Sequence, residues 1–391
     1  MSIMPDRVLA RELHIDLCRE ADVLPLMRFI GTQWQAGHIL SRDEALFRWQ
    51  FAPELLKNQH PPGPTVLLAR FGCEIVGMLG LTGFDLNVSG ARVPAMWLSH
   101  WFAAPAYRVY NVALRLMRAA RDLGVEAHAT LGANEVSARL LARLGFEAIP
   151  SLPRWVGVFD VEAAAELVCV TNPEVLPAEA LRLCRGHVAA LPATAGSERR
   201  FRPTSWSSTT AAAWDRFWSE RLAPQQVGAS RDAAYLQWRY VAHPRFDYHV
   251  AFARQDADGA VEGVAVFRIE QVQDRATRVV RIVEFLASAA AEDGLVRWVL
   301  EAGRDAGAAM ADFYCSSPRA AQAWIRAGFR RQGAESPGAA FPSRLQPLES
   351  GHFPMTTLVR LPEAWRGTLP QLVDDGRLYI TKSDGDQDRP N

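Results

Sequence analysis

The sequence predicts an α/β fold in which a mixed sheet with flanking helices occurs twice. Two observations support this prediction: short segments repeat in the same order along the chain, and the same order of strand and helix patterns accompanies each of them. The length of 391 residues agrees, because it exceeds what one ordinary core holds. Hydrophobic residues make up 49% of the chain, which indicates two folded halves.

The repeat consists of two pairs of matching blocks. Residues 41–51 and 230–240 share the pattern S-R-D-x-A-(aromatic or Leu)-x-x-W-x-aromatic. Further along, SARLLARLGF at 137–146 matches AAQAWIRAGF at 320–329, at nearly the same offset. Two matches in the same order are difficult to obtain by chance, so we infer a duplication.

Strand and helix patterns follow one another in the same order in both copies. A capping box of Ser41 and Glu44 predicts a helix start in the first block. For the first copy we expect helices at 21–36, 112–123 and 136–144, and strands at 65–70, 75–81, 95–102, 127–131 and 154–160. For the second copy we expect strands at 248–254, 261–269, 278–286 and 311–315, and helices at 292–303 and 318–327. This order predicts a mixed sheet with helices on its faces.

The repeats also predict the domain limits. We expect a first domain at 1–160, a connector with helices at 161–229, which includes a helix at 177–189, and a second domain at 230–391. The tail from Ser383 contains Asp384, Asp386 and Asp388 without the Glu that completes an EF-hand loop, so we expect a solvated, loosely held end.

Charge and cysteine usage exclude several classes of protein. Lys and Arg together number 43, as do Asp and Glu, so no global field favours nucleic acid or an anionic membrane. The five cysteines are scattered and form no CxxC pair, which argues against a disulfide framework and a metal site. The N-terminus lacks the apolar run of a signal peptide, and no apolar stretch is long enough to cross a membrane. We expect a cytoplasmic protein.

The loop at 102–113, FAAPAYRVYNVA, carries the resemblance to a known family. It resembles the V-x-P-x-Y-R-G-x-G-x-G/A segment of GNAT N-acetyltransferases, in which a loop and the following helix receive the CoA pyrophosphate. The resemblance covers about 10–160 and again about 230–380. It implies two GNAT-like domains, each with a mostly antiparallel central sheet, splayed parallel strands and flanking helices.

The resemblance implies acetyl-CoA, or another acyl-CoA, as co-substrate. The cofactor-binding residues that it implies follow the central strand of the first copy, with one further residue after the splayed strand: Arg108, Val109, Tyr110, Asn111, Val112, Ala113 and Asn134. Val109 and Asn111 stand where the family has glycine, and side chains there narrow the approach to the backbone. In the second copy, Glu292 and Asp293 at the corresponding helix start would repel phosphate.

The resemblance also implies positions for the catalytic groups. Counting back from the loop, His100 and Glu284 fall where many members carry a glutamate on the strand that acts as the base for the acceptor amine. The tyrosine that protonates the leaving thiolate in many members is replaced by Leu141 and Trp324. Alternatively, His100 is a core histidine, and Glu284 is a structural partner of Arg281 or Arg278.

Three further residues are candidates for contact with the acceptor. Trp97 neighbours His100 on its strand, Trp238 belongs to the repeated block, and His243 lies in the turn that follows it. Core packing is the alternative for the tryptophans, because large aromatic side chains more often anchor a core than bind a ligand.

The function predicted is therefore an acyl-CoA-dependent acyltransferase acting on a small acceptor by direct attack on the thioester. An amino sugar bound for a surface polysaccharide, or another metabolite, is the acceptor favoured. A catalytically silent GNAT-like binding or scaffold protein is the alternative, because the tyrosines and loop glycines are missing. Aminoacyl transfer from tRNA is a third hypothesis, against which the balanced charge argues.

Overall fold

The computed structural model describes residues 13–52, 63–149, 151–192, 201–255, 259–332, 340–349 and 355–389. By its contacts the chain divides into two compact units. Unit 1 comprises 1–84 and 94–130, and unit 2 comprises 85–93 and 131–391. The sequence of 1–12, which underlies the localisation prediction, lies outside the described residues.

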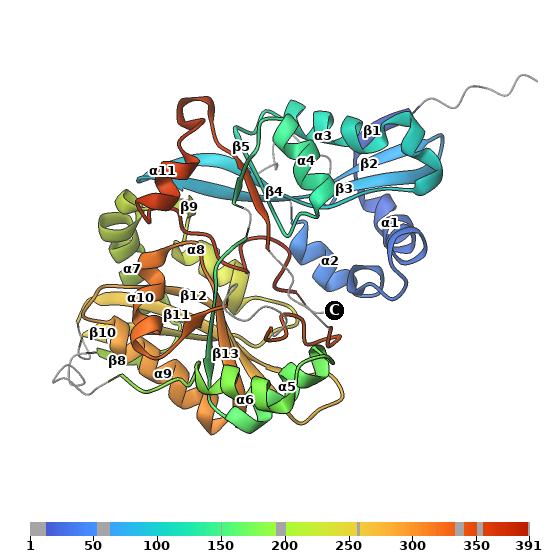
Figure 1. Cartoon of the computed structure of the whole chain (residues 1–391). Coiled ribbons are helices and arrows are strands. Elements are labelled where there is room, and N and C mark those ends of the chain that lie inside the picture. Colours follow the sequence, from blue (N-terminus) through green and yellow to red (C-terminus); the bar gives the residue numbers. More distant parts are fainter. Residues whose placement is uncertain are drawn as a thin grey trace, which may run out of the picture. The chain divides into compact units, whose positions relative to one another are not determined.

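Unit 1 is built on a sheet in the order β1-β2-β3-β4-β5 (Figure 1). Its strands are β1 (Leu13–Leu17), β2 (Val66–Phe71), β3 (Glu74–Val88), β4 (Ala91–Ala103) and β5 (Ala127–Leu131). Its helices are η1 (Glu20–Asp22), α1 (Val23–Phe29), η2 (Ile30–Trp34), η3 (Ile39–Ser41), α2 (Glu44–Gln50), η4 (Pro105–Tyr110) and α3 (Val112–Asp122). β1 and β2 pair antiparallel, as do β2 and β3, whereas β4 and β5 pair parallel.

Helices cover both faces of this sheet. Residues of α1 and α2 share a core with Met78 of β3, and α3 lies over the neighbouring Gly77 on the other face. A Cβ at Gly77 would lie 2.6 Å from the side chain of Val112, so glycine allows α3 to lie close to the sheet. α2 is capped by Asp43, whose carboxylate accepts from the Leu46 N–H at 3.0 Å. The predicted Ser41–Glu44 capping box is therefore wrong.

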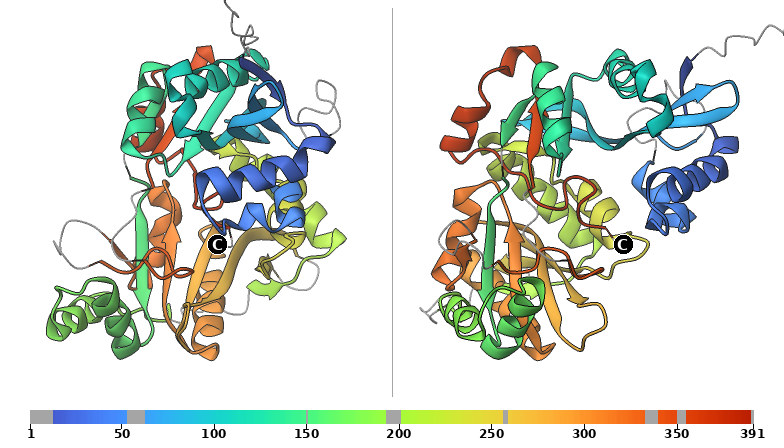
Figure 2. Two further views of the ribbon diagram at one scale, coloured as in Figure 1. Left: turned by 90° about the vertical axis from the view of Figure 1, so that its right-hand side faces the viewer. Right: turned by 45° about the vertical axis from the view of Figure 1, so that its right-hand side comes forward.

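Unit 2 contains a seven-stranded sheet in the order β14-β7-β13-β12-β11-β10-β8, shown from two further directions in Figure 2. Its strands are β7 (Arg154–Val158), β8 (Phe201–Thr204), β10 (His249–Gln255), β11 (Val261–Gln271), β12 (Arg278–Ala287), β13 (Ala308–Tyr314) and β14 (Arg330–Arg331). β12 and β13 pair parallel, and every other pair in it is antiparallel. Outside it, β6 (Glu147–Ile149) pairs with β15 (Thr357–Arg360), and β9 (Val227–Ala229) pairs with 86–88, the end of β3 that belongs to unit 2.

Helices cover both faces of the seven-stranded sheet. The helices of this unit are α4 (Glu135–Arg143), α5 (Val161–Thr171), α6 (Pro177–Arg185), α7 (Ser208–Phe217), η5 (Trp218–Leu222), η6 (Ala223–Gln225), α8 (Ala233–Leu236), η7 (Gln237–Val241), α9 (Glu292–Asp305), α10 (Pro318–Arg326), η8 (Glu363–Trp365) and α11 (Leu369–Asp374). α7, α9 and α10 share a core with Val280, whereas α5 and α6 share a second core with Val279. Adjacent strand residues point to opposite faces, so the two helix groups lie on opposite sides.

The predicted fold class is confirmed, with one strand in a different place. The predicted strand at 154–160 forms β7, but it pairs with β13 and β14 in unit 2. Val156 and Val158 are fully buried there, and Arg154 forms a buried ion pair with Asp312 at 2.6 Å. The strand thus completes the second sheet, while the domain limits 1–160, 161–229 and 230–391 stay a prediction.

Candidate functional site

The two parallel strands of unit 1 separate part of the way along β4. Pairing runs from Ala95–Ala127 to Trp97–Ala129, but β4 continues to Ala103. Beyond Trp97, the edge of β4 that faces β5 therefore has no ladder partner from that strand. Backbone N–H and C=O groups along a bare strand edge can bind an extended ligand or stabilise an oxyanion.

His100 lies on β4 just beyond this separation. Its backbone adopts φ 53°, a left-handed conformation that a non-glycine residue maintains at a cost of about 1–2 kcal/mol. Such conformations are found where the surrounding structure fixes them, often at functional sites. The side chain is 5% exposed, and its Nδ1 lies 2.9 Å from the Ser99 hydroxyl.

Aromatic rings surround the His100 imidazole. The ring centroid of Trp34 lies 5.0 Å away, and those of His38 and Phe51 each lie 5.7 Å away. Trp34 ends η2, a π-turn that continues α1, and Phe51 follows α2. The C-terminal ends of the helical segment 23–34 and of α2 therefore lie beside the histidine.

The predicted phosphate loop forms the short helix η4 and the start of α3. Asn111 separates them with φ 56°, and its side chain does not cap α3. α2, α4, α5, α7, α8 and α10 each have a side-chain cap, whereas α1, α6, α9 and α11 lack a side-chain cap hydrogen bond, as α3 does. The N–H groups in the first turn of α3 therefore receive no cap from the Asn111 side chain, and such N–H groups suit an anion.

Four side chains of the predicted phosphate loop are exposed. Arg108, Val109, Tyr110 and Asn111 are exposed, with Val109 at 80%. Val112 is buried against the sheet, and the Ala113 carbonyl accepts from the Trp101 indole N–H at 2.9 Å. Val109 and Asn111 are both exposed, so their side chains lie on the surface at the positions where the family has glycine.

The second copy has the same split between its parallel strands. Pairing of β12 with β13 runs as far as Ile282–Phe313, and β12 continues to Ala287. Glu284 therefore lies beyond the split, as His100 does in the first copy. Tyr240, which matches Phe51 in the repeated block, donates its hydroxyl to Glu284 at 3.1 Å. The two copies thus bring the same two positions together.

The C-terminal segment, residues 378–388, occupies the split of the second copy. On the β13 side, Thr381 bridges Cys315, and the Ser316 N–H donates to the Ile380 carbonyl at 2.9 Å. On the β12 side, the Tyr379 hydroxyl bonds both the N–H and the C=O of Phe285 at 3.1 Å. The chain itself therefore takes the space in which a ligand would lie between β12 and β13.

Glu284 is sealed inside a network of charges. Its carboxylate accepts from Arg231 Nε at 2.5 Å and from the Tyr379 hydroxyl, and Arg231 also pairs with Asp384 at 2.7 Å. Glu284 and Arg231 are 0% exposed. Burial raises the pKa of Glu284, whereas the Arg231 guanidinium opposes that shift. The structural partner is therefore Arg231, not Arg281, and the site has no access for an acceptor.

The tail extends this network, contrary to the expected solvated end. Asp388 accepts from Arg268 Nη2 at 2.8 Å and from the Tyr248 hydroxyl at 2.6 Å, and the pKa of its carboxyl is lowered by Arg268 despite burial. Lys382 is 8% exposed, and burial lowers its pKa to about 7. The expectation failed because the partners of these charges lie more than a hundred residues away in sequence.

The remaining predicted residues have structural contacts. The Asn134 carboxamide caps α4 by accepting from Ser137 N–H at 2.9 Å. Trp97 is buried and stacked on Phe84 at 5.2 Å, and Trp238 lies 5.9 Å from Tyr235. The Nδ1 atom of His243 accepts from two backbone N–H groups in its turn, and burial lowers its pKa to about 3.

Sequence reasoning did not find the aromatic surroundings of His100 or the role of Arg231. A signal existed for both, because Phe51 and Arg231 belong to the repeated blocks. Within the described residues, all five cysteines are free, no His, Cys, Asp and Glu cluster could hold a metal ion, and no helix combines the length and apolar character needed to cross a bilayer.

Comparisons with known proteins support the enzyme class. Residues 33–146 match the acetyltransferase (GNAT) family, and no curated protein was found to match the sequence. This matched region contains the split strands, His100 and the uncapped start of α3. The match supports the predicted GNAT-type acyltransferase.

Solved structures extend the likeness of fold beyond the matched region. A GCN5-related N-acetyltransferase from Kribbella flavida has a TM-score of 0.52 and 16% identity, covering 92% of this chain and 73% of that one. One from Anabaena variabilis has a TM-score of 0.53 and 12% identity, covering 91% and 74%. Saccharomyces cerevisiae N-myristoyltransferase with bound myristoyl-CoA has a TM-score of 0.51 and 10% identity, covering 92% and 83%. At these identities the likeness concerns the fold.

Proposed function

We propose that the first copy binds an acyl-CoA and transfers its acyl group to the amine of a small acceptor. The observation that carries the proposal is the separation of β4 from β5 beyond Trp97, with His100 on β4 just past it and the start of α3, which Asn111 does not cap, after it. The family match over 33–146 covers all three features. The myristoyl-CoA bound to the yeast N-myristoyltransferase supports an acyl-CoA as co-substrate.

The cofactor would lie along the open part of β4. Its pyrophosphate would accept from the N–H groups at the start of α3, with the exposed Arg108 nearby in sequence as a counter-charge. Its pantetheine arm would run along β4 beyond the residues that pair with β5. This arrangement would bring the thioester carbonyl to backbone N–H groups of β4, which would stabilise the oxyanion.

The reaction would proceed by direct attack. The acceptor nitrogen bonds to the thioester carbonyl carbon while its proton passes to His100, and the carbon–sulfur bond then breaks to release CoA thiolate. Histidine suits this role because its ordinary pKa lies near neutrality. Leu141 cannot supply a proton, so water would protonate the thiolate.

We further propose an amino sugar or another small metabolite as acceptor, acetyl as the acyl group and the cytoplasm as the location. The free cysteines support a reducing compartment. The second copy is proposed to be silent, because the C-terminal segment fills its split. A molecule silent in both copies is the alternative, favoured by the side chains at 109 and 111.

Acetyl-CoA binding is the first test. Binding to the folded state must raise the thermal midpoint, so millimolar acetyl-CoA should raise it by several degrees. Thiol release against a panel of amino sugars then reports turnover. His100→Ala should lower kcat about 100-fold or more, whereas the exposed His14→Ala, a matched control, should not. No midpoint shift with acetyl-CoA would favour the silent protein.

A further inference from the structure

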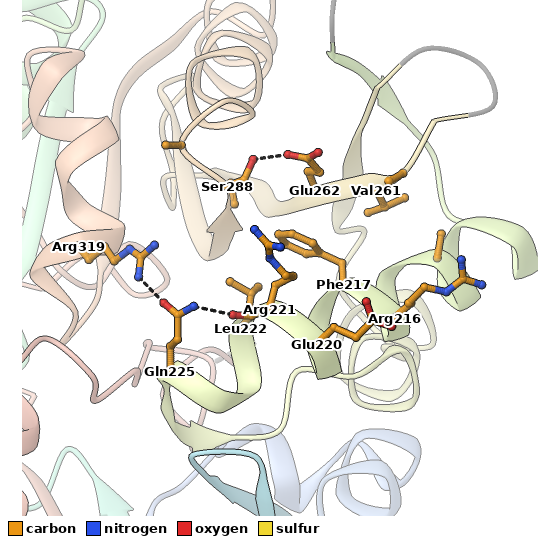
Figure 3. Close-up of a pocket in the computed structure, with 14 residues that line it drawn as sticks. Arg216, Phe217, Glu220, Arg221, Leu222, Gln225, Val261, Glu262, Ser288 and Arg319 are labelled. Carbon is orange, nitrogen blue, oxygen red and sulfur yellow. Dashed lines mark hydrogen bonds between the residues drawn. The ribbon is translucent and has the colours of Figure 1, made fainter.

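A groove of about 450 Å³ opens on the surface of unit 2 (Figure 3). It lies between α7 and η5 on one side and the ends of β11 and β12 on the other, and Arg319 at the start of α10 closes it. Its volume falls within the range of about 300–1,000 Å³ that small-molecule sites have. The proposed acyl-CoA site is in the other copy, so this groove has no assigned role.

Arginines give the groove a positive surplus. Arg216, Arg221 and Arg319 line it, against Glu220 and Glu262. Among the described residues, the Arg216 and Arg221 guanidiniums have no hydrogen bond or ion pair. Figure 3 shows the Arg221 side chain in the middle of the groove, beside the ring of Phe217.

The other charged groups in the groove are at least partly engaged. Glu262 accepts from the Ser288 hydroxyl at 2.6 Å, and Arg319 donates through Nη1 to the Gln225 side chain at 2.9 Å. A guanidinium has five donors, so Arg319 can still bind a second acceptor. Arg221 and Arg319 therefore both have guanidinium donors available to a ligand.

Apolar side chains make up much of the remaining lining. Phe217 and Leu222 come from the helical side, and Val261 and Ala287 come from the strand side. Val261 is 1% exposed and Leu222 is 8% exposed, so both belong to the core under the groove. The groove thus combines an apolar floor with free guanidinium groups.

The duplication shows which part of the fold this groove occupies. In the first copy the Ala104 N–H donates to the Val76 carbonyl, and in the second the Ser288 N–H donates to the Glu262 carbonyl, both at 2.8 Å. A π-turn also follows Phe29 in the first copy and Phe217 in the second. The groove therefore lies between α7 and η5, which correspond to α1 and η2 of the first copy, and the end of β12, which corresponds to β4.

The start of α9 itself does not provide an anion site. Glu292 and Asp293 occupy its first turn, and Arg326 pairs with them at 2.6 Å and 3.1 Å. Any anion would therefore be held by arginine side chains, not by the helix terminus. This distinguishes the groove from the phosphate site proposed in the first copy.

We propose that this groove is a second ligand site that binds a small amphipathic anion. Arg221 and Arg319 hold its carboxylate or phosphate, since guanidinium groups bind both. Phe217, Ala213 and Ala287, which are only half-buried, contact its apolar body. Such a ligand satisfies Arg221 and covers the apolar floor at once, which neither inorganic phosphate nor a neutral hydrocarbon can do.

Isothermal titration calorimetry on the full chain tests the proposal with three probes. Octanoate and phenyl phosphate represent the two anionic groups, and inorganic phosphate lacks an apolar body. We expect octanoate, phenyl phosphate or both to bind, with inorganic phosphate at least about tenfold weaker because the apolar contact is lost. Inorganic phosphate binding as tightly as the better of the two amphipathic probes, or no binding by any probe at about 5 mM, would overturn the proposal.

Variants then locate the site. Arg221→Ala should weaken the bound probe about tenfold or more, Arg221→Lys should retain part of the affinity, and Phe217→Ala should weaken octanoate. Arg185→Ala on α6, another exposed arginine of the same unit, should leave binding unchanged. An Arg221→Ala protein that binds the probes normally refutes the assignment. The Arg221→Ala protein should bind acetyl-CoA as tightly as the natural chain. A failure of the groove proposal can therefore be distinguished from a failure of the proposed transferase activity.

Discussion

Replacing Glu284 by Gln separates a structural role from a catalytic one. The change keeps the size of the side chain but removes the charge that Arg231 Nε contacts at 2.5 Å. Arg231 would then keep only Asp384, at 2.7 Å, as a counter-charge. Both Glu284 and Arg231 are fully buried, so water cannot replace the lost carboxylate oxygen.

The expected loss of stability follows from this geometry. Removing one partner of a buried ion pair typically costs about 3–5 kcal/mol. Because Asp384 still compensates part of the Arg231 charge, we expect about 3 kcal/mol. With a urea dependence of about 3 kcal/mol per M, the unfolding midpoint of unit 2 should fall by about 1 M.

A surface pair provides the matched control. Glu166 pairs with Arg275 Nη1 at the same 2.5 Å, but its side chain is 63% exposed. Glu166→Gln should therefore cost less than about 1 kcal/mol. Urea unfolding followed by circular dichroism measures both variants. If Glu284→Gln abolished thiol release while leaving the midpoint unchanged, Glu284 would be a catalytic base and the structural assignment would be wrong.

Three further results are expected. Asn111→Asp keeps a residue type that tolerates the left-handed backbone but adds a negative charge at the start of α3. Because that charge repels pyrophosphate and favours the helix start, the change should weaken acetyl-CoA binding by about 1 kcal/mol or more in a titration while slightly stabilising α3. Equal affinity would contradict the proposed phosphate site. Between about pH 7 and 10.5 the unfolded chain holds a proton on Lys382 that the folded chain has released, so stability should rise with pH, and Lys382→Met should remove that slope in urea titrations at pH 7–9. A thiol reagent should modify the exposed Cys73 rapidly but reach Cys315 only on unfolding, since burial raises the pKa of that thiol.

Much of the fold could be predicted because its signals are local. Strand alternation and helix periodicity located the strands and helices of both copies, and the repeated blocks showed which elements of the two copies correspond. The partner of β7 could not be predicted, because strand pairing depends on contacts far away in sequence. Val156 and Val158 show that the strand is buried, but burial alone does not say in which sheet.

The candidate site could be predicted only in part, for a similar reason. His100 and the loop at 108–113 could be predicted because they are neighbours in sequence, at the end of β4 and the start of α3. The C-terminal segment could not be placed, since a polar tail with several Asp residues has the composition of a solvated end. Its burial depends on Arg231, Arg268 and Tyr248, which lie 153, 120 and 140 residues from their partners.

The occupied split explains why the two copies should differ in function. In the second copy, Tyr379 and Ser383 bond the β12 backbone at Phe285 and Val283, which is the edge that a pantetheine arm would need. Because the tail brings the Asp384 carboxylate into this gap, a buried cation is required, and Arg231 provides it. The Arg231 guanidinium also pairs with the Glu284 carboxylate. The second copy therefore cannot hold the tail and a thioester on the same strand edge, so catalysis, if the proposal holds, falls to the copy that carries His100.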